Sequence, residues 1–151
     1  QLVPYLDDIV QTLVNAFQYY QARNLLILYD AVGTLADSVG SELDKPQYVQ
    51  ALGAPLMQKF ETVADNDRSI IQLFECLSGV VQHLGVSLLP LMPQLIQRCG
   101  RLILDGARAA QMWLQNPNEF EKPDREVMAA SIDLLAGIVS GLQGRVGDVL
   151  A

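Results

Sequence analysis

Apolar residues recur along this chain at the three- and four-residue intervals that are typical of amphipathic helices. In the first segment the apolar positions are Leu2, Leu6, Ile9, Val10, Leu13, Val14 and Phe17. No segment alternates apolar and polar residues over the length of a strand while being rich in β-branched residues. The pattern therefore predicts an all-α fold.

Capping and helix-breaking residues divide this pattern into six helices. We expect the helices at about residues 2–20, 24–39, 47–64, 69–84, 87–114 and 124–142. Asn24 and Asp124 can cap the second and sixth helices. Gly40 can end the second helix and Gly85 the fourth. The connections are short, so neighbouring helices should run antiparallel.

Several prolines should shape the third and fifth helices. Pro46 suits the first turn of the third helix, where its missing N–H costs nothing. Gly53 and Pro55 should bend that helix or split it. Pro90 and Pro93 should kink the first turns of the fifth helix.

The second, fourth and sixth predicted helices repeat one pattern in register. An apolar residue precedes a carboxylate, which is followed by two apolar residues, two small or hydroxyl residues and one more apolar residue. The carboxylates are Asp30, Glu75 and Asp133, so the offsets are about 45 and 58 residues. Helix pairs that recur every 40–47 residues are the signature of HEAT or armadillo solenoids.

The sequence therefore predicts a HEAT-repeat α-solenoid, in which antiparallel helix pairs stack into a segment of a right-handed superhelix. We expect repeats at residues 1–43, 44–86 and 87–144, with residues 145–151 beginning a further, truncated repeat. A helix pair cannot bury its apolar face alone, so each pair should pack on its neighbours.

The composition agrees with a packed segment of a larger assembly. Of 151 residues, 50% are hydrophobic, which excludes intrinsic disorder. Only 18% are charged, against about 25% in a typical globular chain. We therefore expect that other repeats cover part of the apolar surface, and that both ends are cuts through a longer protein. The exposed end faces could also let the chain associate with itself.

Charge and residue spacing also exclude several function classes. The net charge of −7 argues against a nucleic-acid partner, which requires a basic patch. No apolar run approaches the roughly 18 residues of a membrane span. Cys76 and Cys99 lack disulfide or metal spacing and are expected to be buried free thiols. His83 is the only histidine and no phosphate-binding glycine motif occurs, so we expect no metal and no cofactor.

The repeating helices carry acids without bases. Residues 24–40 contain Asp30 and Asp37, residues 69–85 contain Glu75, and residues 127–143 contain Asp133, with no Lys or Arg in any of these ranges. Equivalent positions of a solenoid fall on one surface, so these four carboxylates should form a row. The row is either a solvated face or an acidic track that attracts an extended segment rich in Lys and Arg.

An enzyme is the weaker hypothesis for these acids. Paired carboxylates in glycoside hydrolysis lie about 5–9.5 Å apart in a closed site. Asp30 and Asp37 lie two turns apart, about 10 Å along a helix axis, on a face expected to be open. Neither Ser38 nor Ser41 has a histidine nearby in the sequence.

Other conspicuous residues lie on the fifth helix. Arg98, Arg101 and Arg108 share one side of it, where they form either a solvated outer stripe or ion pairs with acids elsewhere in the chain. Trp113 lies on the same helix, and packing is the favoured interpretation over a ligand cage.

The stretch from Asn24 to Gly40, NLLILYDAVGTLADSVG, resembles the transportins, the karyopherin-β nuclear import receptors. Looser resemblance follows in the same order in Asp44-Lys45-Pro46, Glu75-Cys76-Leu77-Ser78, Gln97-Arg98-Cys99 and Asp133-Leu134-Leu135. The resemblance covers essentially the whole chain without gaps. It implies a piece of a superhelix of HEAT repeats, from the middle to C-terminal half, in which the second helix of each repeat lines the concave surface.

The resemblance also implies a function. Transportins bind cargo proteins through an extended signal with a basic or hydrophobic stretch followed by Arg and Pro-Tyr, and Ran-GTP releases the cargo. Asp30, Asp37, Glu75 and Asp133 match acidic positions that meet the basic groups of the signal. Ser140 stands where the family often has a further acid, which could shift cargo preference. The Pro-Tyr pocket should lie mostly upstream of Gln1 and the Ran contacts mainly elsewhere, so this chain should hold only part of the cargo site. Nucleoporin partners and shuttling between cytoplasm and nucleus follow from the same resemblance.

Overall fold

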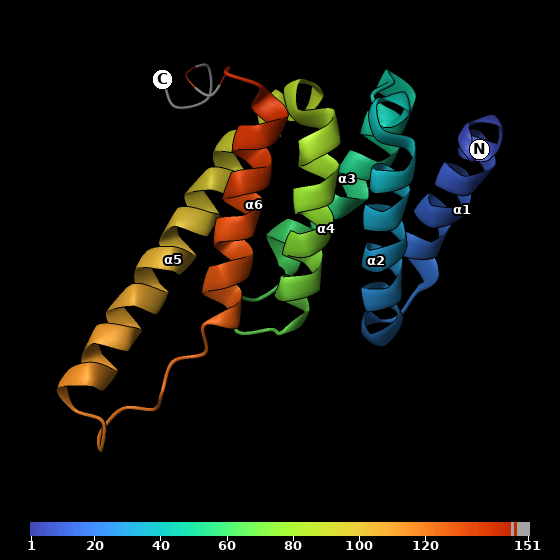
Figure 1. Ribbon diagram of the computed structural model, residues 1–151. Coiled ribbons are helices and arrows are strands. Elements are labelled where there is room, and N and C mark those ends of the chain that lie inside the picture. The colour runs from blue at the N-terminus through green and yellow to red at the C-terminus, as the bar shows by residue number, and fades with distance from the viewer. Residues whose placement is uncertain (146, 148–151) are drawn as a thin grey trace.

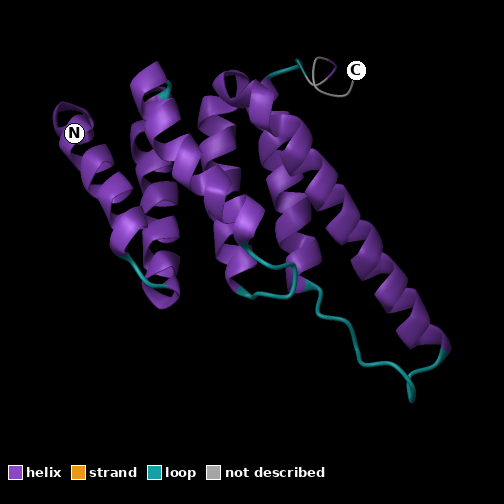
Figure 2. Ribbon diagram, turned by 180° about the vertical axis from the view of Figure 1, so that it is seen from behind, coloured by secondary structure: helices purple, strands orange, loops and turns teal. Residues whose placement is uncertain are grey.

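The computed structural model describes residues 1–145 and 147. Its elements are η1 (Val3–Tyr5), α1 (Leu6–Tyr19), α2 (Ala22–Val39), η2 (Gly40–Leu43), α3 (Pro46–Thr62), α4 (Ser69–Leu84), η3 (Gly85–Leu91), α5 (Met92–Gln115) and α6 (Glu126–Leu142), where η denotes a 3-10 helix. Within this described part, helices and their connections make up the whole structure (Figure 2). The all-α prediction is therefore confirmed. The further repeat expected at residues 145–151 lies mostly outside the described residues.

Three helix pairs follow one another along the chain (Figure 1). α4 lies between α2 and α6 and makes its most extensive contacts with these two helices. α1 packs on α3, and α5 packs on α6. The pairs α1/α2, α3/α4 and α5/α6 lie within the ranges expected for three repeats, except that η3 crosses the expected boundary after residue 86. α2, α4 and α6 therefore lie side by side in one layer.

Two helix starts differ from the sequence prediction. Pro4 occupies the first turn of the 3-10 helix η1, and α1 begins only at Leu6. α2 begins at Ala22 after an extended Gln21, so Asn24 lies inside the first turn and the predicted Asn24 cap is wrong. No side chain caps α2, whose first N–H groups are donors without a helical partner.

Other predictions for the helix ends are confirmed or refined. Gly40 ends α2 with a φ of 52°, a value that favours glycine. Pro46 is in the first turn of α3, but Pro55 leaves α3 unsplit because a buried apolar face continues on both sides of it. The predicted kink at the start of the fifth helix is the 3-10 helix η3, which contains Pro90. Asp124 accepts a hydrogen bond of 2.9 Å from the backbone N–H of Glu126, but the N-cap residue of α6 is Arg125, so the predicted cap lies one residue too early.

Glycines bring α4 close to α6 but are not required on its other side. A Cβ on Gly33 of α2 would lie 3.8 Å from the Cα of Cys76, which is an ordinary van der Waals contact. On the other side of α4, a Cβ on Gly141 would lie 2.1 Å from the carbonyl oxygen of Val81, and one on Gly85 would lie 2.0 Å from that of Gly141. Gly85 ends α4 with a φ of −16°, so it does not adopt the left-handed conformation of a usual glycine cap. The close approach of two backbones explains this glycine.

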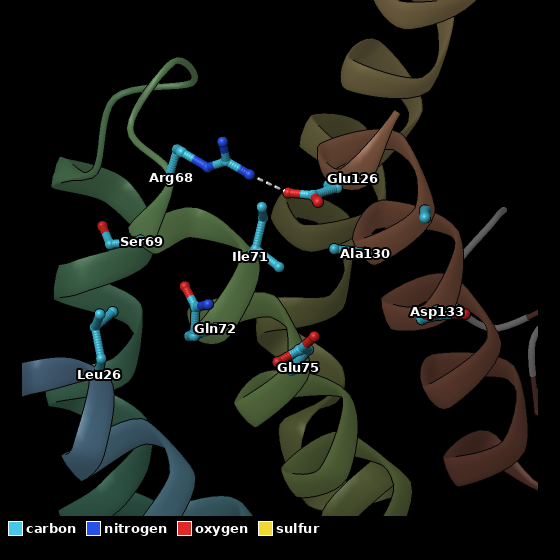
Figure 3. Close-up of a pocket in the computed structure, with 10 residues that line it drawn as sticks. Leu26, Arg68, Ser69, Ile71, Gln72, Glu75, Glu126, Ala130 and Asp133 are labelled. Atoms are coloured by element: carbon cyan, nitrogen blue, oxygen red, sulfur yellow. Dashed lines mark hydrogen bonds and ion pairs between the residues drawn. The ribbon is translucent and has the colours of Figure 1, made fainter. Parts of the chain in front are cut away.

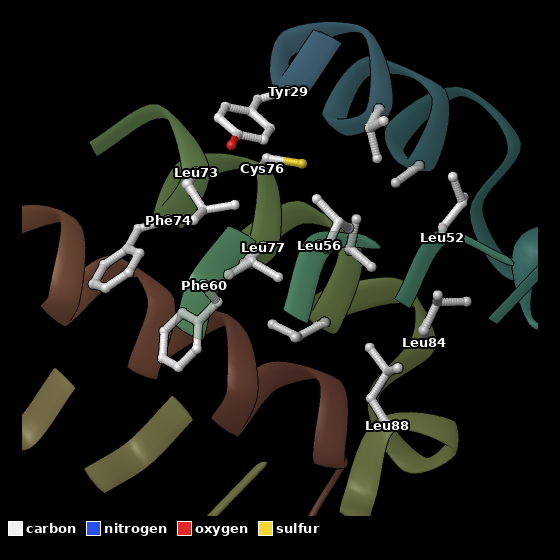
Figure 4. Packing of buried hydrophobic residues seen from close by; sticks show 14 of the residues in the cluster. Tyr29, Leu52, Leu56, Phe60, Leu73, Phe74, Cys76, Leu77, Leu84 and Leu88 are labelled. Carbon is white, nitrogen blue, oxygen red and sulfur yellow. The ribbon is translucent and has the colours of Figure 1, made fainter. Parts of the chain in front are cut away.

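The apolar core runs between the layer of α2, α4 and α6 and the other three α-helices, α1, α3 and α5 (Figure 4). Phe74 is fully buried and its ring centroid lies 5.7 Å from that of Phe60 on α3. Leu52 and Leu56 of α3 and Leu77 of α4 belong to the same cluster. Because the buried side of α4 is part of this continuous core, the packing fixes the rotation of α4 about its axis. It thereby also fixes which residues of α4 are exposed beside α2 and α6.

Arg98 joins α5 to the end of α3. Its guanidinium donates to the carbonyl oxygens of Phe60 and Val63 at the end of α3 and forms an ion pair of 2.6 Å with Asp65. The same Asp65 binds Arg101, and Arg108 pairs with Asp105 on its own helix. A solvated stripe is therefore the wrong interpretation for Arg98, whose side chain is only 13% exposed. Each of the three arginines has an acidic partner within the chain.

The helical run Ser69–Gln115 is long and apolar enough to cross a membrane by length and composition alone. It comprises α4, η3 and α5, and 44% of its most apolar window is buried inside the fold. Core helices pass the same test, so this is weak evidence for a membrane span.

Candidate functional site

The first part of the candidate site is a groove between α2 and α4. Asp30 and Asp37 line it from α2, and Glu75 lines it from α4. Its volume is about 210 Å³. Tyr29 and Cys76 also line this groove, and burial raises the pKa of each to about 12. Both groups are therefore neutral at physiological pH, and the charge of the groove comes from its three carboxylates.

The second part is a groove of about 510 Å³ between α4 and α6. Figure 3 shows Glu75 on α4 and Asp133 on α6 along this groove. Glu126 and Arg68 lie toward the other end, where the two helices begin. Glu75 lines both grooves, so the grooves adjoin along α4. The structure thus brings all four predicted acids onto one face.

The packing of the helices holds these acids in register. Ser78 Oγ donates a hydrogen bond of 3.1 Å to the backbone oxygen of Asp133, which ties α6 to α4 beside the acid. A Cβ on Gly137 would lie 2.6 Å from Ser78 Oγ, so the helices can approach this closely only because residue 137 has no side chain. Asp133 therefore occupies a position that the backbone contact fixes.

The four acids differ in their internal partners. Asp37 Oδ1 lies 3.2 Å from His83 Nε2 across the α2/α4 contact. Asp30, Glu75 and Asp133 form no ion pair within the part of the chain that the structure describes. Since all three are exposed, they present charge that an external cation can reach.

Arg68 and Glu126 also line the second groove, although the sequence did not predict them as site residues. The Arg68 guanidinium donates to Glu126 and lies 3.8 Å from Asp124 Oδ2. The signal was present, because Arg68 and Glu126 are 58 residues apart, the same offset that relates Glu75 to Asp133. Charges within single helices do not reveal this pair, because its two residues lie on different helices at positions in register.

Two further features limit the chemistry of this face. Ser140 is exposed on α6 but lines neither groove. Among the described residues, no group of three or more His, Cys, Asp and Glu side chains could hold a metal ion. The arrangement is an open, negatively charged surface suited to charge-assisted hydrogen bonds with cationic side chains.

Stacked antiparallel helix pairs with register-matched inner helices define the class of protein: an all-α, HEAT-repeat solenoid segment. Over all 151 residues the chain is 45% identical to transportin-1 of Homo sapiens. It is 41% identical over 150 residues to importin subunit beta-2 of Schizosaccharomyces pombe, and 40% identical over 144 residues to transportin of Dictyostelium discoideum. This similarity supports the identification of the chain as a transportin segment.

The alignments to the human and Schizosaccharomyces pombe relatives include 99–100% of this chain. The chain spans only 16–17% of the length of these relatives. No family model matches the chain.

Proposed function

We propose that this chain is part of a nuclear import receptor and binds the basic part of a cargo protein's nuclear localisation signal of the basic/Pro-Tyr type. The binding residues are Asp30, Asp37, Glu75 and Asp133. The observation that carries this proposal is that Glu75 lines both grooves, which makes the acids of three helices one continuous surface. The names of the relatives, transportin and importin, support a transport role.

The binding mechanism follows from the charges. Lys and Arg side chains of a disordered signal are attracted by this mainly acidic surface and form charge-assisted hydrogen bonds with its carboxylates. The signal loses conformational entropy when it becomes ordered, so the affinity of this segment alone is modest. Added salt screens exposed charges and weakens binding.

The remaining partners belong to the longer receptor. Cargo release by Ran-GTP, contact with nucleoporins and shuttling between cytoplasm and nucleus are proposed for the whole protein, of which this chain represents a short part. The three-repeat division at residues 1–43, 44–86 and 87–144 belongs to the same proposal. The proposed role is non-enzymatic and involves neither nucleic acid nor membrane.

The alternative is a structural HEAT-repeat segment with no cargo site of its own. The observation that favours this alternative is that Asp37, the acid at one end of the row, already has His83 as a partner within the chain. A structural segment requires only that the acids be solvated.

Fluorescence anisotropy of a labelled peptide with a basic stretch followed by Arg and Pro-Tyr separates the two functions. We expect the chain to bind this peptide less tightly at high salt. The double variant Asp30→Lys/Asp37→Lys should lower the affinity by roughly tenfold or more, since attraction at two positions becomes repulsion. Circular dichroism checks that each variant is folded.

The matched control is Glu119→Lys/Glu121→Lys, which makes the same change in net charge in the exposed loop before α6. The control should change the affinity much less than the groove variant. Equal losses would show that only net charge matters, and absence of binding by the folded wild type would favour the structural segment.

A further inference from the structure

Arg68 is the single cationic residue among the described residues that line the two grooves. It immediately precedes α4, and its side chain reaches across the groove toward the start of α6 (Figure 3). There the guanidinium donates to the Glu126 carboxylate and lies 3.8 Å from Asp124. One end of the acidic groove therefore already holds a guanidinium that belongs to the chain.

This contact has the chemistry that the proposed function assigns to cargo. A guanidinium bound to a groove carboxylate is the interaction that an arginine of a basic signal would make. Glu75 and Asp133 lie farther along the same groove and have no ion-pair partner within the described residues. At one end of the groove the carboxylate of Glu126 is thus paired within the chain. Farther along, the carboxylates of Glu75 and Asp133 remain available to an external cation.

We propose that Arg68 is a specificity-determining residue, which competes with incoming basic side chains for Glu126 and so marks the end of the free acidic track. This inference rests on the proposed function, because it describes how the same site selects its ligand. A basic segment meets Glu75 and Asp133 directly. It reaches Glu126 only after it displaces Arg68.

The exposure of the pair suits such competition. The side chains of Arg68 and Glu126 are 73% and 60% exposed. Ion pairs that are this exposed contribute little to stability, so an external cation can replace the internal one at small cost. The positive charge of Arg68 also repels cations that approach within about 10 Å at ordinary salt. Both effects weaken binding of long basic runs more than of short ones.

The test is the affinity of Arg68→Gln for two labelled peptides, measured by fluorescence anisotropy. One peptide carries a short basic stretch and the other a longer run of arginines. We expect Arg68→Gln to bind the longer peptide about twofold to fivefold more tightly than wild type, as for one exposed charge pair. The gain for the shorter peptide should be smaller, since that peptide does not reach Glu126.

Arg108→Gln is the matched control. Arg108 is 73% exposed, as Arg68 is, and it pairs with the carboxylate of Asp105, but it lines neither groove. The substitution Arg108→Gln removes one positive charge from the chain, as Arg68→Gln does. If Arg108→Gln raises the affinity as much as Arg68→Gln does, the inference is overturned.

The double variant Arg68→Gln/Glu126→Gln tests whether the gain comes from the freed carboxylate. We expect its affinity to return close to that of wild type, and a gain that persists would overturn the inference. If wild type binds the peptides but Arg68→Gln behaves like Arg108→Gln, only this inference fails. If neither folded wild type nor any variant binds, the proposed function fails and this inference fails with it.

Discussion

Arg98 and Arg101 bind one carboxylate, that of Asp65, from very different surroundings. The side chain of Arg98 is 13% exposed and that of Arg101 is 56% exposed. Arg98 also donates to two backbone oxygens at the end of α3 and lies over the ring of Phe60, with Cζ 4.9 Å from its centroid. Its removal leaves two half-buried backbone acceptors without this donor, whereas removal of Arg101 does not.

We therefore expect Arg98→Ala to lower the free energy of unfolding by about 3 kcal/mol. Arg101→Ala, the matched control, should lower it by less than about 1 kcal/mol because an exposed ion pair contributes little. Urea unfolding followed by circular dichroism measures both. Similar losses for the two variants would contradict a special role for Arg98.

The two cysteines provide a second prediction at this scale. Burial raises the pKa of both the Cys76 and Cys99 thiols from 9.0 to about 12. At pH 8 only roughly one thiol in ten thousand is then ionised in the folded chain, and the thiolate is the reactive form. We expect neither cysteine to react with a thiol reagent until the chain is unfolded, as judged by the absorbance of the released chromophore.

The same pKa shifts give a pH dependence. In the unfolded chain the thiols ionise near pH 9, whereas in the folded chain they ionise near pH 12. The folded state thus holds more protons between these values, so the free energy of unfolding falls as the pH rises from about 9 toward 12. Replacement of both cysteines by alanine should flatten this part of the stability profile.

At the scale of single residues, the sequence predicted the burial of the cysteines, but it left ion pairs of the arginines as one of two alternatives and did not identify any partner. The apolar neighbours of Cys76 and Cys99 in the sequence indicate burial directly. The pairing of Asp65 with Arg98 joins residues 33 positions apart, and that of Asp37 with His83 joins residues 46 apart. Such pairs depend on how helices stack, which helical periodicity alone does not specify.

Between elements, glycines control how closely α4 and α6 approach. A Cβ at residue 141 would lie 2.1 Å from the carbonyl oxygen of Val81, a distance that only movement of the backbone can relieve. We expect Gly141→Ala to lower the free energy of unfolding by at least about 2 kcal/mol, as overpacking of a core does. The thermal midpoint measured by calorimetry reports this loss.

Gly100→Ala is the control for Gly141→Ala. Gly100 lies within α5, and a Cβ there meets nothing within 4 Å. Alanine in that open helical position should raise the free energy of unfolding by about 0.5–1 kcal/mol. If both variants shift the midpoint in the same direction, close packing of α4 on α6 is not the cause.

The helices themselves were largely predictable from the sequence because each has a clear apolar face and most end at Gly, Pro or a polar turn. α4 begins and ends where the sequence placed it, at Ser69 and Leu84. The errors lie where tertiary contacts decide. Gly85 is required by the backbone of Gly141, and the 3-10 helix η3 replaces the expected first turns of the fifth helix.

For the whole molecule, the repeat register was the most informative feature of the sequence. It predicted that Asp30, Glu75 and Asp133 lie on one face, and the structure brings them together in two adjoining grooves. The grooves themselves could not be predicted, because their shape depends on the side chains between the helices. Whether these acids bind a ligand stays a prediction.

Association of the chain with itself is expected from its exposed apolar faces. Ile132 and Val139 lie seven residues apart on α6 and are 49% and 55% exposed, and Ile27 on α2 is 70% exposed. We expect sedimentation velocity to show association that increases with concentration. Val139→Glu should reduce it, whereas Ser140→Glu, which adds the same charge to the adjacent exposed position, should reduce it less.

The glycine contacts between α4 and α6 also set a scale for any extended ligand. Helices that meet at small residues lie near the lower end of the usual interaxial range, about 8 Å. An extended chain advances roughly 3.3 Å per residue. Glu75 on α4 and Asp133 on α6 are thus separated by about two to three residues of a peptide that crosses the two helices. The spacing of basic residues, and not their number alone, therefore decides which signals match this face.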